Sequence, residues 1–331
     1  MLPSSPRPVF VIGSFVMACC WFARRLPARG EHLHADGFLM EPGGKGLNVA
    51  VGLRRLGTPV HLLLGVGNDP AADALHRLLR NERLPEAHVH RFAGASGHGM
   101  GLIDDAGDNI IVVHPGANHR LGAEHAHAAT ADIAASALVY GQFEVADAVL
   151  AEAFRLARQA GTPTVLNPSP WRPIAPELLR HVDTLLLNEQ EALALFSPES
   201  KPSESTLEQD WTAHASRWRH AHPGIDLVIT LAAAGCMVWP HDAAAPSHHP
   251  AQAVEAVDTT GCGDAFAAAW CSGLANQASP DATVTLALAA GAWVAARPGV
   301  LAALPMAADL RGGPARPVTI SPEAPRARRG S

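Results

Sequence analysis

The sequence lacks the features that mark several classes of protein. Only 17% of its 331 residues are charged while 48% are hydrophobic, which excludes wholesale disorder and allows a sizeable buried core. No C-x-x-C pair occurs among the five cysteines, and no H-E-x-x-H pattern occurs among the 18 histidines, so these redox and zinc motifs are absent. An odd number of cysteines favours free thiols in a reducing compartment, and we therefore expect a cytoplasmic protein.

A long membrane-spanning apolar run is also missing. The stretch of residues 8–23 is uncharged but too short to span a bilayer comfortably. Because it follows Arg7, it resembles a short signal peptide, and Val16-Met17-Ala18-Cys19 resembles a lipoprotein cleavage box. A buried first strand over Val9–Ile12, ending at Gly13, explains the same residues. We favour the strand, because the segments that follow require one.

Basic charge is scarce outside the C-terminus. The net charge is −6, and residues 311–331 hold five Arg against one Glu, so the rest of the chain carries −10. A body this acidic is a poor nucleic-acid binder, and we expect no nucleic-acid and no membrane partner. The Pro- and Arg-rich composition of residues 311–331 predicts a disordered tail.

Strand-like apolar segments alternate with helical patterns along the chain. This alternation predicts an α/β fold whose mostly parallel central sheet has helices on both faces. The predicted strands are residues 9–12, 60–64, 138–140, 164–166, 184–187 and 226–231. The predicted helices are residues 48–56, 71–81, 146–160 and 281–296, with two more after Asn188 and Gly263.

Two stretches interrupt this alternation. Residues 99–103 and 109–113 flank Asp104-Asp105-Ala106-Gly107-Asp108, which is a hairpin signature. Residues 31–40 lack a helical period. Together they predict a small antiparallel piece attached to the α/β body. Residues 198–205 predict a surface loop.

The strongest chemical motif is Asp258-Thr259-Thr260-Gly261-Cys262-Gly263-Asp264, directly before an Ala-rich helical segment. Gly261 and Gly263 leave backbone amides uncovered, and amides at a helix N-terminus attract anions such as a phosphoryl group. Asp264 suits two interpretations. It is either a simple acid in the first helical turn or a proton acceptor beside a bound phosphate, and the motif alone leaves both open.

A second glycine-rich motif, Gly43-Gly44-Lys45-Gly46-Leu47-Asn48, also precedes a helix. Its spacing is not that of a Walker A loop. The glycines let a ligand approach the backbone, and Lys45 and Asn48 can hydrogen-bond hydroxyl groups. A tight turn with Asn48 as the helix N-cap explains the motif equally well.

Two further segments end predicted strands. Asn188-Glu189-Gln190-Glu191 is close to a capping box, and taken alone the cap is the better explanation. Thr230 ends a strand before the small residues 232–235. Strand ends in such sheets are where ligands bind.

These motifs, taken in order, resemble the ribokinase family, also called the PfkB-type carbohydrate kinases. The two signatures lie at residues 43–48 and 258–264. The lesser motifs between them are His114-Pro115-Gly116-Ala117-Asn118, Gln142-Phe143-Glu144, Asn167-Pro168, Asn188-x-x-Glu191 and Thr230-Leu231. The resemblance covers roughly residues 8–305. It implies a ribokinase-like domain over residues 1–310, with a β lid from about residues 14–42 and 96–114.

The resemblance also implies an activity and the residues that perform it. The activity is ATP-dependent phosphorylation of a sugar hydroxymethyl group, with D-ribose as the nominal substrate. Asp264 is the implied general base, beside an anion hole formed by the amides of Gly261, Cys262 and Gly263. The implied sugar contacts are Gly44, Lys45, Asn48, Glu144 and Asp264. The implied nucleotide contacts are Asn188, Thr230, Gly235 and Gly263. Glu191 would hold Mg²⁺ through water, and Asp258 and Thr260 match ligands of a K⁺ site.

The chain departs from the family pattern at the sugar site. Ribokinases have an Asn and an Asp after the first strand that grip sugar hydroxyls, whereas Val16 and Ala18 stand at those positions here. This leaves open another furanose-bearing substrate, such as fructose or a nucleoside, or a non-catalytic sugar-binding protein. Ala303 replaces a serine of the K⁺ site, which weakens the expectation of K⁺ activation. The β-rich edge of the lid favours a homodimer.

Overall fold

The computed structural model describes residues 6–106, 108–196 and 211–311. The surface loop predicted at residues 198–205 lies outside the described residues, as does the predicted tail apart from Arg311. The domain boundaries therefore stay a prediction. Within the described ranges, no helix is long and apolar enough to cross a membrane.

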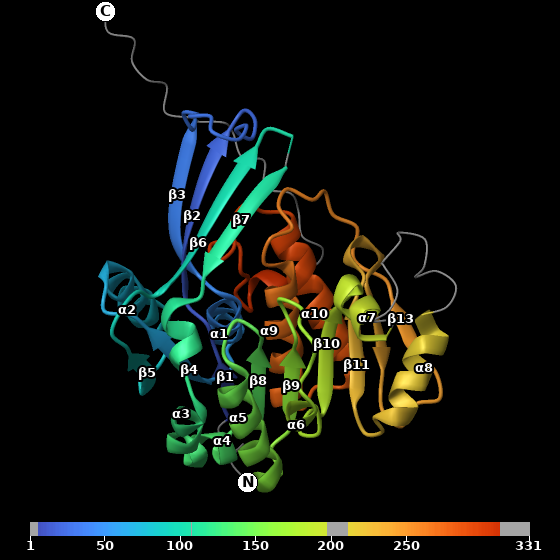
Figure 1. Ribbon diagram of the computed structural model, residues 1–331. Helices are drawn as coiled ribbons and strands as arrows, with labels where there is room; N and C mark the ends of the chain where they lie inside the picture. Colours follow the sequence, from blue (N-terminus) through green and yellow to red (C-terminus); the bar gives the residue numbers. More distant parts are fainter. Residues whose placement is uncertain (1–5, 107, 197–210, 312–331) are drawn as a thin grey trace, which may run out of the picture.

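A nine-stranded sheet forms the centre of the body, with strand order β13-β12-β11-β10-β9-β8-β1-β4-β5 (Figure 1). All neighbours from β11 to β5 pair in parallel, and only β12 and β13 are antiparallel, so the prediction of a mostly parallel sheet is confirmed. The strands are β1 (Val9–Ile12), β4 (Val60–Val66), β5 (His88–Arg91), β8 (Leu138–Gln142), β9 (Thr164–Asn167), β10 (Thr184–Asn188), β11 (Asp226–Thr230), β12 (Cys236–Trp239) and β13 (Ser247–His249).

The strand β1 confirms the preferred interpretation of the N-terminal apolar stretch. It lies between β4 and β8, and all four of its side chains are 0% exposed. A parallel strand covered on both faces is apolar at every position instead of alternating. Because every residue of this buried strand is apolar, the segment resembles the apolar part of a signal peptide.

Helices cover both faces of the sheet, as the sequence predicts. One face is packed by α1 (Lys45–Arg55), α2 (Pro70–Glu82), α9 (Cys262–Ala275) and α10 (Pro280–Ala295). The other face is packed by α3 (Ala123–Ala128), α4 (Thr130–Ala135), α5 (Asp147–Ala160), α6 (Pro176–Leu179), α7 (Glu189–Phe196) and α8 (Trp211–Ala221). Helix α1 begins three residues earlier than predicted. Its N-cap is therefore Gly44, and the interpretation of Asn48 as the N-cap is wrong.

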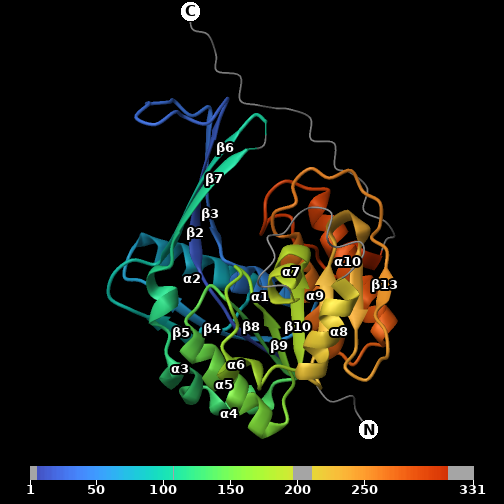
Figure 2. The same ribbon diagram turned by 45° about the vertical axis from the view of Figure 1, so that its right-hand side comes forward.

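A second sheet, here called the lid sheet, has the strand order β3-β2-β6-β7. Its strands are β2 (Val16–Ala23), β3 (Gly37–Gly43), β6 (Gly97–Asp104) and β7 (Asn109–His114). The predicted hairpin is confirmed by the antiparallel pairing of β6 with β7. The expectation of an antiparallel piece is wrong for the centre of the sheet, because β2 and β6 pair in parallel. Figures 1 and 2 show the lid sheet standing beyond the carboxyl ends of the central strands, above one side of the body.

The base of the lid sheet is fixed by one buried side chain. Asn118 lies in the 3-10 turn Gly116–Arg120, and its Oδ1 accepts a hydrogen bond from the Phe15 amide at 2.9 Å. Its Nδ2 donates to the Phe15 carbonyl at 2.8 Å. Both backbone groups of Phe15 are thus satisfied where the chain passes from β1 into β2. The motif that contains Asn118 therefore anchors the lid sheet to the body.

Gly46 generates a testable prediction about how α1 is seated. A Cβ at this position would lie 2.2 Å from the Gly13 Cα, so backbone would have to shift. We expect Gly46→Ala to lower the free energy of unfolding by about 1–3 kcal/mol, measured by urea denaturation. Gly291 in α10 is the control, because its added Cβ would approach the Cys262 carbonyl oxygen only to 3.6 Å. Gly291→Ala should be neutral or stabilising, and equal effects of the two variants would contradict the prediction.

Candidate active site

The order of the central strands reverses between β1 and β8. The chain leaves β1 toward β4 and β5, whereas it leaves β8 toward β9, β10 and β11. Ligands of open α/β sheets bind at the carboxyl ends of the strands beside such a reversal. Ser14 follows β1 and Glu144 follows β8, and the Ser14 hydroxyl donates to Glu144 Oε2 at 2.5 Å. This hydrogen bond marks the centre of the site.

The first turn of α1 is attached to the same two side chains. The Lys45 amide donates to Glu144 Oε2 at 2.9 Å, and the Gly46 amide donates to the Ser14 hydroxyl at 3.3 Å. Gly44 has a φ of 112°, and a Cβ there would lie 2.5 Å from the Ser14 carbonyl oxygen, so glycine is required. Sequence reasoning missed Ser14, because a serine after a buried strand is not distinctive by itself.

Asp264 lies in the first turn of α9 and is 7% exposed. Its Oδ2 accepts a hydrogen bond from Asn48 Nδ2 at 2.7 Å. Burial raises the pKa of Asp264, while Lys45 and the Asn48 hydrogen bond act to lower it and Glu144 adds to the rise. Asn48 Oδ1 is buried without a partner within the described ranges. The structure thus brings all five predicted sugar-contact residues together around a buried carboxylate.

The turn before α9 presents open amides. Gly261 has a φ of 81°, and the amides of Gly261 and Gly263 have no hydrogen-bond partner among the described residues. The Cys262 amide donates to the Thr259 carbonyl in a long bond of 3.3 Å. The two glycine amides are therefore the freer donors for an anion. Burial raises the pKa of the Cys262 thiol to about 11, so the thiol adds no negative charge here at neutral pH.

Asn188 and Glu191 form the reciprocal pair of a capping box. The Asn188 amide donates to Glu191 Oε2, and the Glu191 amide donates to Asn188 Oδ1, both at 2.8 Å. The capping interpretation of this motif is therefore confirmed. Glu191 is 4% exposed, and burial raises its pKa, against the Asn188 amide, the Ser169 side chain and Lys45, which lower it. Only Oε2 takes part in the cap, and oxygen donors suit Mg²⁺, so Glu191 fits a site for this ion through water.

The remaining predicted nucleotide contacts lie near this cap. Thr230 pairs with Asn188 in the register of β10 and β11, at the carboxyl ends of both strands. Gly235 follows with a φ of 101°, and a Cβ there would lie 2.0 Å from the His249 carbonyl oxygen. The turn between β11 and β12 therefore requires glycine at this position.

Lys45 connects the two halves of the site electrostatically. Its charge counteracts the burial that raises the pKa of Asp264 and of Glu191. The ammonium group therefore lies close enough to both carboxylates to stabilise their ionised forms. A cation in this position also suits a phosphoryl group passing from one half of the site to the other.

Asp258 closes the turn that leads to the open amides. Its Oδ1 accepts from the Thr260 amide at 2.9 Å, and its Oδ2 accepts from the Gly299 amide at 3.2 Å. Both oxygens already take part in hydrogen bonds, and Ala303 brings no hydroxyl. These contacts give Asp258 a structural role in this turn, and the second lone pair of each oxygen is compatible with the predicted K⁺ contact.

A different group of residues could hold a metal ion elsewhere. Donor atoms of His61, His88 and Asp132 lie within 4.8 Å of one another. His61 pairs with Phe10 in the register of β4 and β1, at the end of the sheet away from Ser14. This cluster is therefore separate from the site described above.

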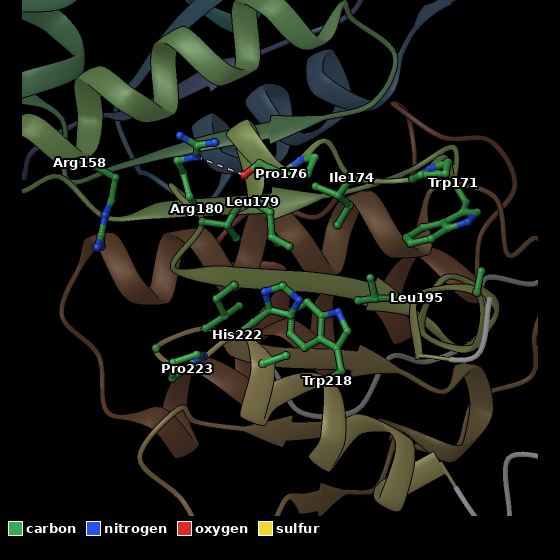
Figure 3. Close-up of a pocket in the computed structure, with 16 residues that line it drawn as sticks. Arg158, Trp171, Ile174, Pro176, Leu179, Arg180, Leu195, Trp218, His222 and Pro223 are labelled. Atoms are coloured by element: carbon green, nitrogen blue, oxygen red, sulfur yellow. Dashed lines mark hydrogen bonds between the residues drawn. The ribbon is translucent and has the colours of Figure 1, made fainter. Parts of the chain in front are cut away.

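A cavity of about 830 Å³ lies between α5, α6, α7 and α8 (Figure 3). Trp171, Arg180, Trp218 and His222 are among its lining residues. Figure 3 shows the rings of Trp218 and His222 lying against each other, with Arg158 and Arg180 on the opposite side. None of the predicted catalytic, sugar-binding, nucleotide-binding or metal-binding residues lines this cavity.

Comparisons with known proteins bear on the family and the fold. A model of the pfkB family of carbohydrate kinases matches residues 7–307. The chain is 32% identical to ribokinase of Mus musculus over 264 residues, covering 79% of this chain and 80% of that protein. It is 30% identical to ribokinase of Bacillus subtilis over 284 residues, covering 85% and 90% of the two chains. The structure of Arabidopsis thaliana ribokinase complexed with ribose and ATP superposes with a TM-score of 0.84 at 24% identity, covering 93% of this chain and 98% of that one. The expectation of a ribokinase-like fold is confirmed.

The raised pKa of Asp264 predicts a stability effect. Because the folded-state pKa lies above the unfolded value, stability present at acidic pH is lost as the pH rises through the folded-state pKa. We therefore expect Asp264→Asn to unfold at a higher temperature than the wild type at pH 7, with the difference shrinking at acidic pH. Thermal unfolding followed by circular dichroism at both pH values measures it.

The matched control for this prediction is Asp258→Asn. It makes the same chemical change at a carboxylate that accepts two backbone hydrogen bonds. Since hydrogen bonds to a charged acceptor are stabilising, this variant should unfold at a lower temperature than the wild type. A midpoint of Asp264→Asn at or below the wild-type value at pH 7 would contradict the prediction.

Proposed function

Because the chain belongs to the pfkB family of carbohydrate kinases, we propose that it transfers a phosphoryl group from ATP to the hydroxymethyl group of D-ribose, with Asp264 as the general base. Its family and its ribokinase relatives make it an ATP-dependent sugar kinase. The observation that carries the finer assignment is the buried Asp264 carboxylate beside the open amides of Gly261 and Gly263.

In this mechanism Asp264 accepts the proton of the sugar's hydroxymethyl group. The hydroxymethyl oxygen attacks the terminal phosphorus of ATP, and the bond between this phosphorus and ADP breaks. Burial raises the pKa of Asp264, which makes the carboxylate a better proton acceptor. The Asn48 hydrogen bond holds the carboxylate in place, and the unpartnered Asn48 Oδ1 can accept a sugar hydroxyl.

Nearby groups of the site would stabilise the negative charge of the transferred phosphoryl group. The amides of Gly261 and Gly263 at the start of α9 and the ammonium group of Lys45 would stabilise it, with the Cys262 amide as a weaker donor. Mg²⁺ bound with ATP would supply further neutralisation of phosphate charge. Glu191 would hold that ion through water, and Asn188, Thr230 and Gly235 would line the nucleotide side.

The choice of sugar depends on the lid sheet, where Val16 and Ala18 bring no polar group. The Mus musculus and Bacillus subtilis relatives are ribokinases, which supports ribose. Fructose or a nucleoside is the alternative that the departure at these two positions favours. A non-catalytic sugar-binding protein is disfavoured, since Asp264 and its glycines are intact.

We also propose that two chains pair through their lid sheets. Large apolar side chains of β3 and β7, the two edge strands, are exposed: Phe38 (57%), Met40 (59%), Ile111 (67%), Val112 (57%) and Val113 (53%). A second copy of the sheet would cover them.

K⁺ activation through Asp258 and Thr260 stays a prediction, as does a cytoplasmic location, which the free cysteines favour.

The activity is tested by measuring ADP release over a panel of pentoses, hexoses and nucleosides. We expect D-ribose to give the highest kcat/KM, and Asp264→Asn to lower kcat by about 10²- to 10⁴-fold, the usual contribution of a general base. Asp36→Asn, at an exposed carboxylate of the loop between β2 and β3 that pairs with Arg24, should leave kcat unchanged. Full activity of Asp264→Asn would rule out its role as the base.

The dimer is tested with Ile111→Asp, which places a charge in the exposed apolar surface of β7. We expect the wild type to have twice the mass of one chain by light scattering and Ile111→Asp to have the mass of one chain. Leu274→Ala is the control, because Leu274 is exposed (39%) in α9, outside the lid sheet. A wild type with the mass of one chain at micromolar concentration would refute the pairing.

A further inference from the structure

The strands β2 and β3 place a carboxylate directly opposite Ala18. In their antiparallel register Ala18 pairs with Glu41, and Val16 pairs with Gly43. Directly opposite residues project from the same face, with Cβ atoms about 4.5–5.5 Å apart. The small side chain of Ala18 leaves room for the longer Glu41 side chain. On this face of the lid sheet, β2 brings only the apolar side chains of Val16 and Ala18, whereas β3 brings the carboxylate of Glu41.

Two neighbouring groups show which way this face of the lid sheet points. Cys20 lies two residues beyond Ala18, on the same face of β2. Burial raises the pKa of the Cys20 thiol, with the charges of Glu41 and Asp258 adding to the effect. Burial likewise raises the pKa of Glu41, with the charge of Asp258 as the second cause. Because Asp258 begins the turn that leads to the open amides, Glu41 faces the catalytic turn.

Glu41 has no hydrogen bond or ion pair among the described residues, although it is half-buried. Two carboxylates of the loop between β2 and β3 differ in this respect. Glu31 pairs with Arg25, and Asp36 lies 3.7 Å from Arg24. The charge of Asp258, which acts on Glu41, is also negative. A partly desolvated carboxylate without a donor is costly, so this side chain is suited to hydroxyl donors that a ligand brings.

We propose that Glu41 binds hydroxyl groups of the sugar substrate and so supplies, from β3, the carboxylate that β2 lacks at Ala18. The proposal rests on the proposed function and names the substrate class more closely, as a furanose with neighbouring free hydroxyls. An ionised carboxylate accepts two such hydroxyls at once. The position is fixed, because β3 runs through Gly43 directly into Lys45 and α1.

The first experiment compares the kinetics of Glu41→Gln and Glu41→Ala with those of the wild type. We expect the KM for the sugar to rise by about 10- to 100-fold, as for a lost hydrogen bond to a charged group, while the KM for ATP stays unchanged. Asp36→Asn, at the residue before β3, is the matched control, and its sugar KM should equal that of the wild type.

The second experiment moves the carboxylate back to β2. In the double variant Ala18→Asp with Glu41→Ala, the sugar KM should return toward the wild-type value, because position 18 lies opposite position 41. In Ala18→Asp alone the two carboxylates would face each other, and their repulsion should prevent any gain in sugar affinity. A merely structural role of Glu41 would not produce this rescue.

The outcomes separate this inference from the proposed function. If the wild type phosphorylates no sugar or nucleoside, the proposed function fails and the inference fails with it. If the wild type is active and the Glu41 variants keep its sugar KM, only the inference is overturned. The inference is also overturned if Glu41→Gln raises the KM for ATP as much as that for the sugar, or if thermal unfolding shows that the isosteric Gln variant is unfolded.

Discussion

The carboxylate of Glu144 joins three elements of the fold at one point. It accepts the Ser14 hydroxyl from the end of β1 and the Lys45 amide from the start of α1, while Glu144 itself follows β8. A carboxylate at a helix N-terminus is stabilised by the helix dipole and by the open amides there. The same contact thus fixes α1, ties the end of β1 to the end of β8, and places Asn48 where it reaches Asp264. Glu144 has a structural role that its implied role as a sugar contact does not reveal.

The site gathers negative charge in an acidic protein. Asp264, Glu191 and Glu144 all lie near Lys45, and burial raises the pKa of Asp264 and Glu191. Such an arrangement is poor at holding phosphate by bulk charge. The phosphoryl group depends instead on directed donors, which are the glycine amides and the lysine. The acidic groups suit the opposite task of accepting protons and hydroxyls from the sugar.

Local sequence patterns predicted most of the central sheet, because buried parallel strands such as β1 are apolar throughout. Three strands were missed: β5, in which three of four residues are charged or histidine, β13, which consists of Ser-His-His, and the four-residue apolar strand β12. β5 and β13 lie at the edges of the sheet, where pairing and not burial defines the strand. β12 is an antiparallel addition outside the alternation of strand and helix from which the other strands were predicted. The motif residues Gly44, Asp264 and Glu191 were found from spacing. Ser14 and Glu41 were not, since their positions depend on contacts with Glu144, 130 residues away, and on the register of β2 with β3.

The contact of Asn118 with Phe15 has a mechanical consequence. Both hydrogen bonds clamp the chain where it enters β2, and the Asn118 side chain also packs against Gly97, where β6 begins and where a Cβ would lie 2.5 Å from Asn118 Nδ2. The two central strands of the lid sheet, β2 and β6, are therefore both anchored at Asn118. A sheet anchored at one end is restrained most at that end, so the strand ends nearest Asn118 are held firmly beside the body. The exposed apolar side chain of Phe38, at the start of β3, lies at the far end of the sheet from this anchor.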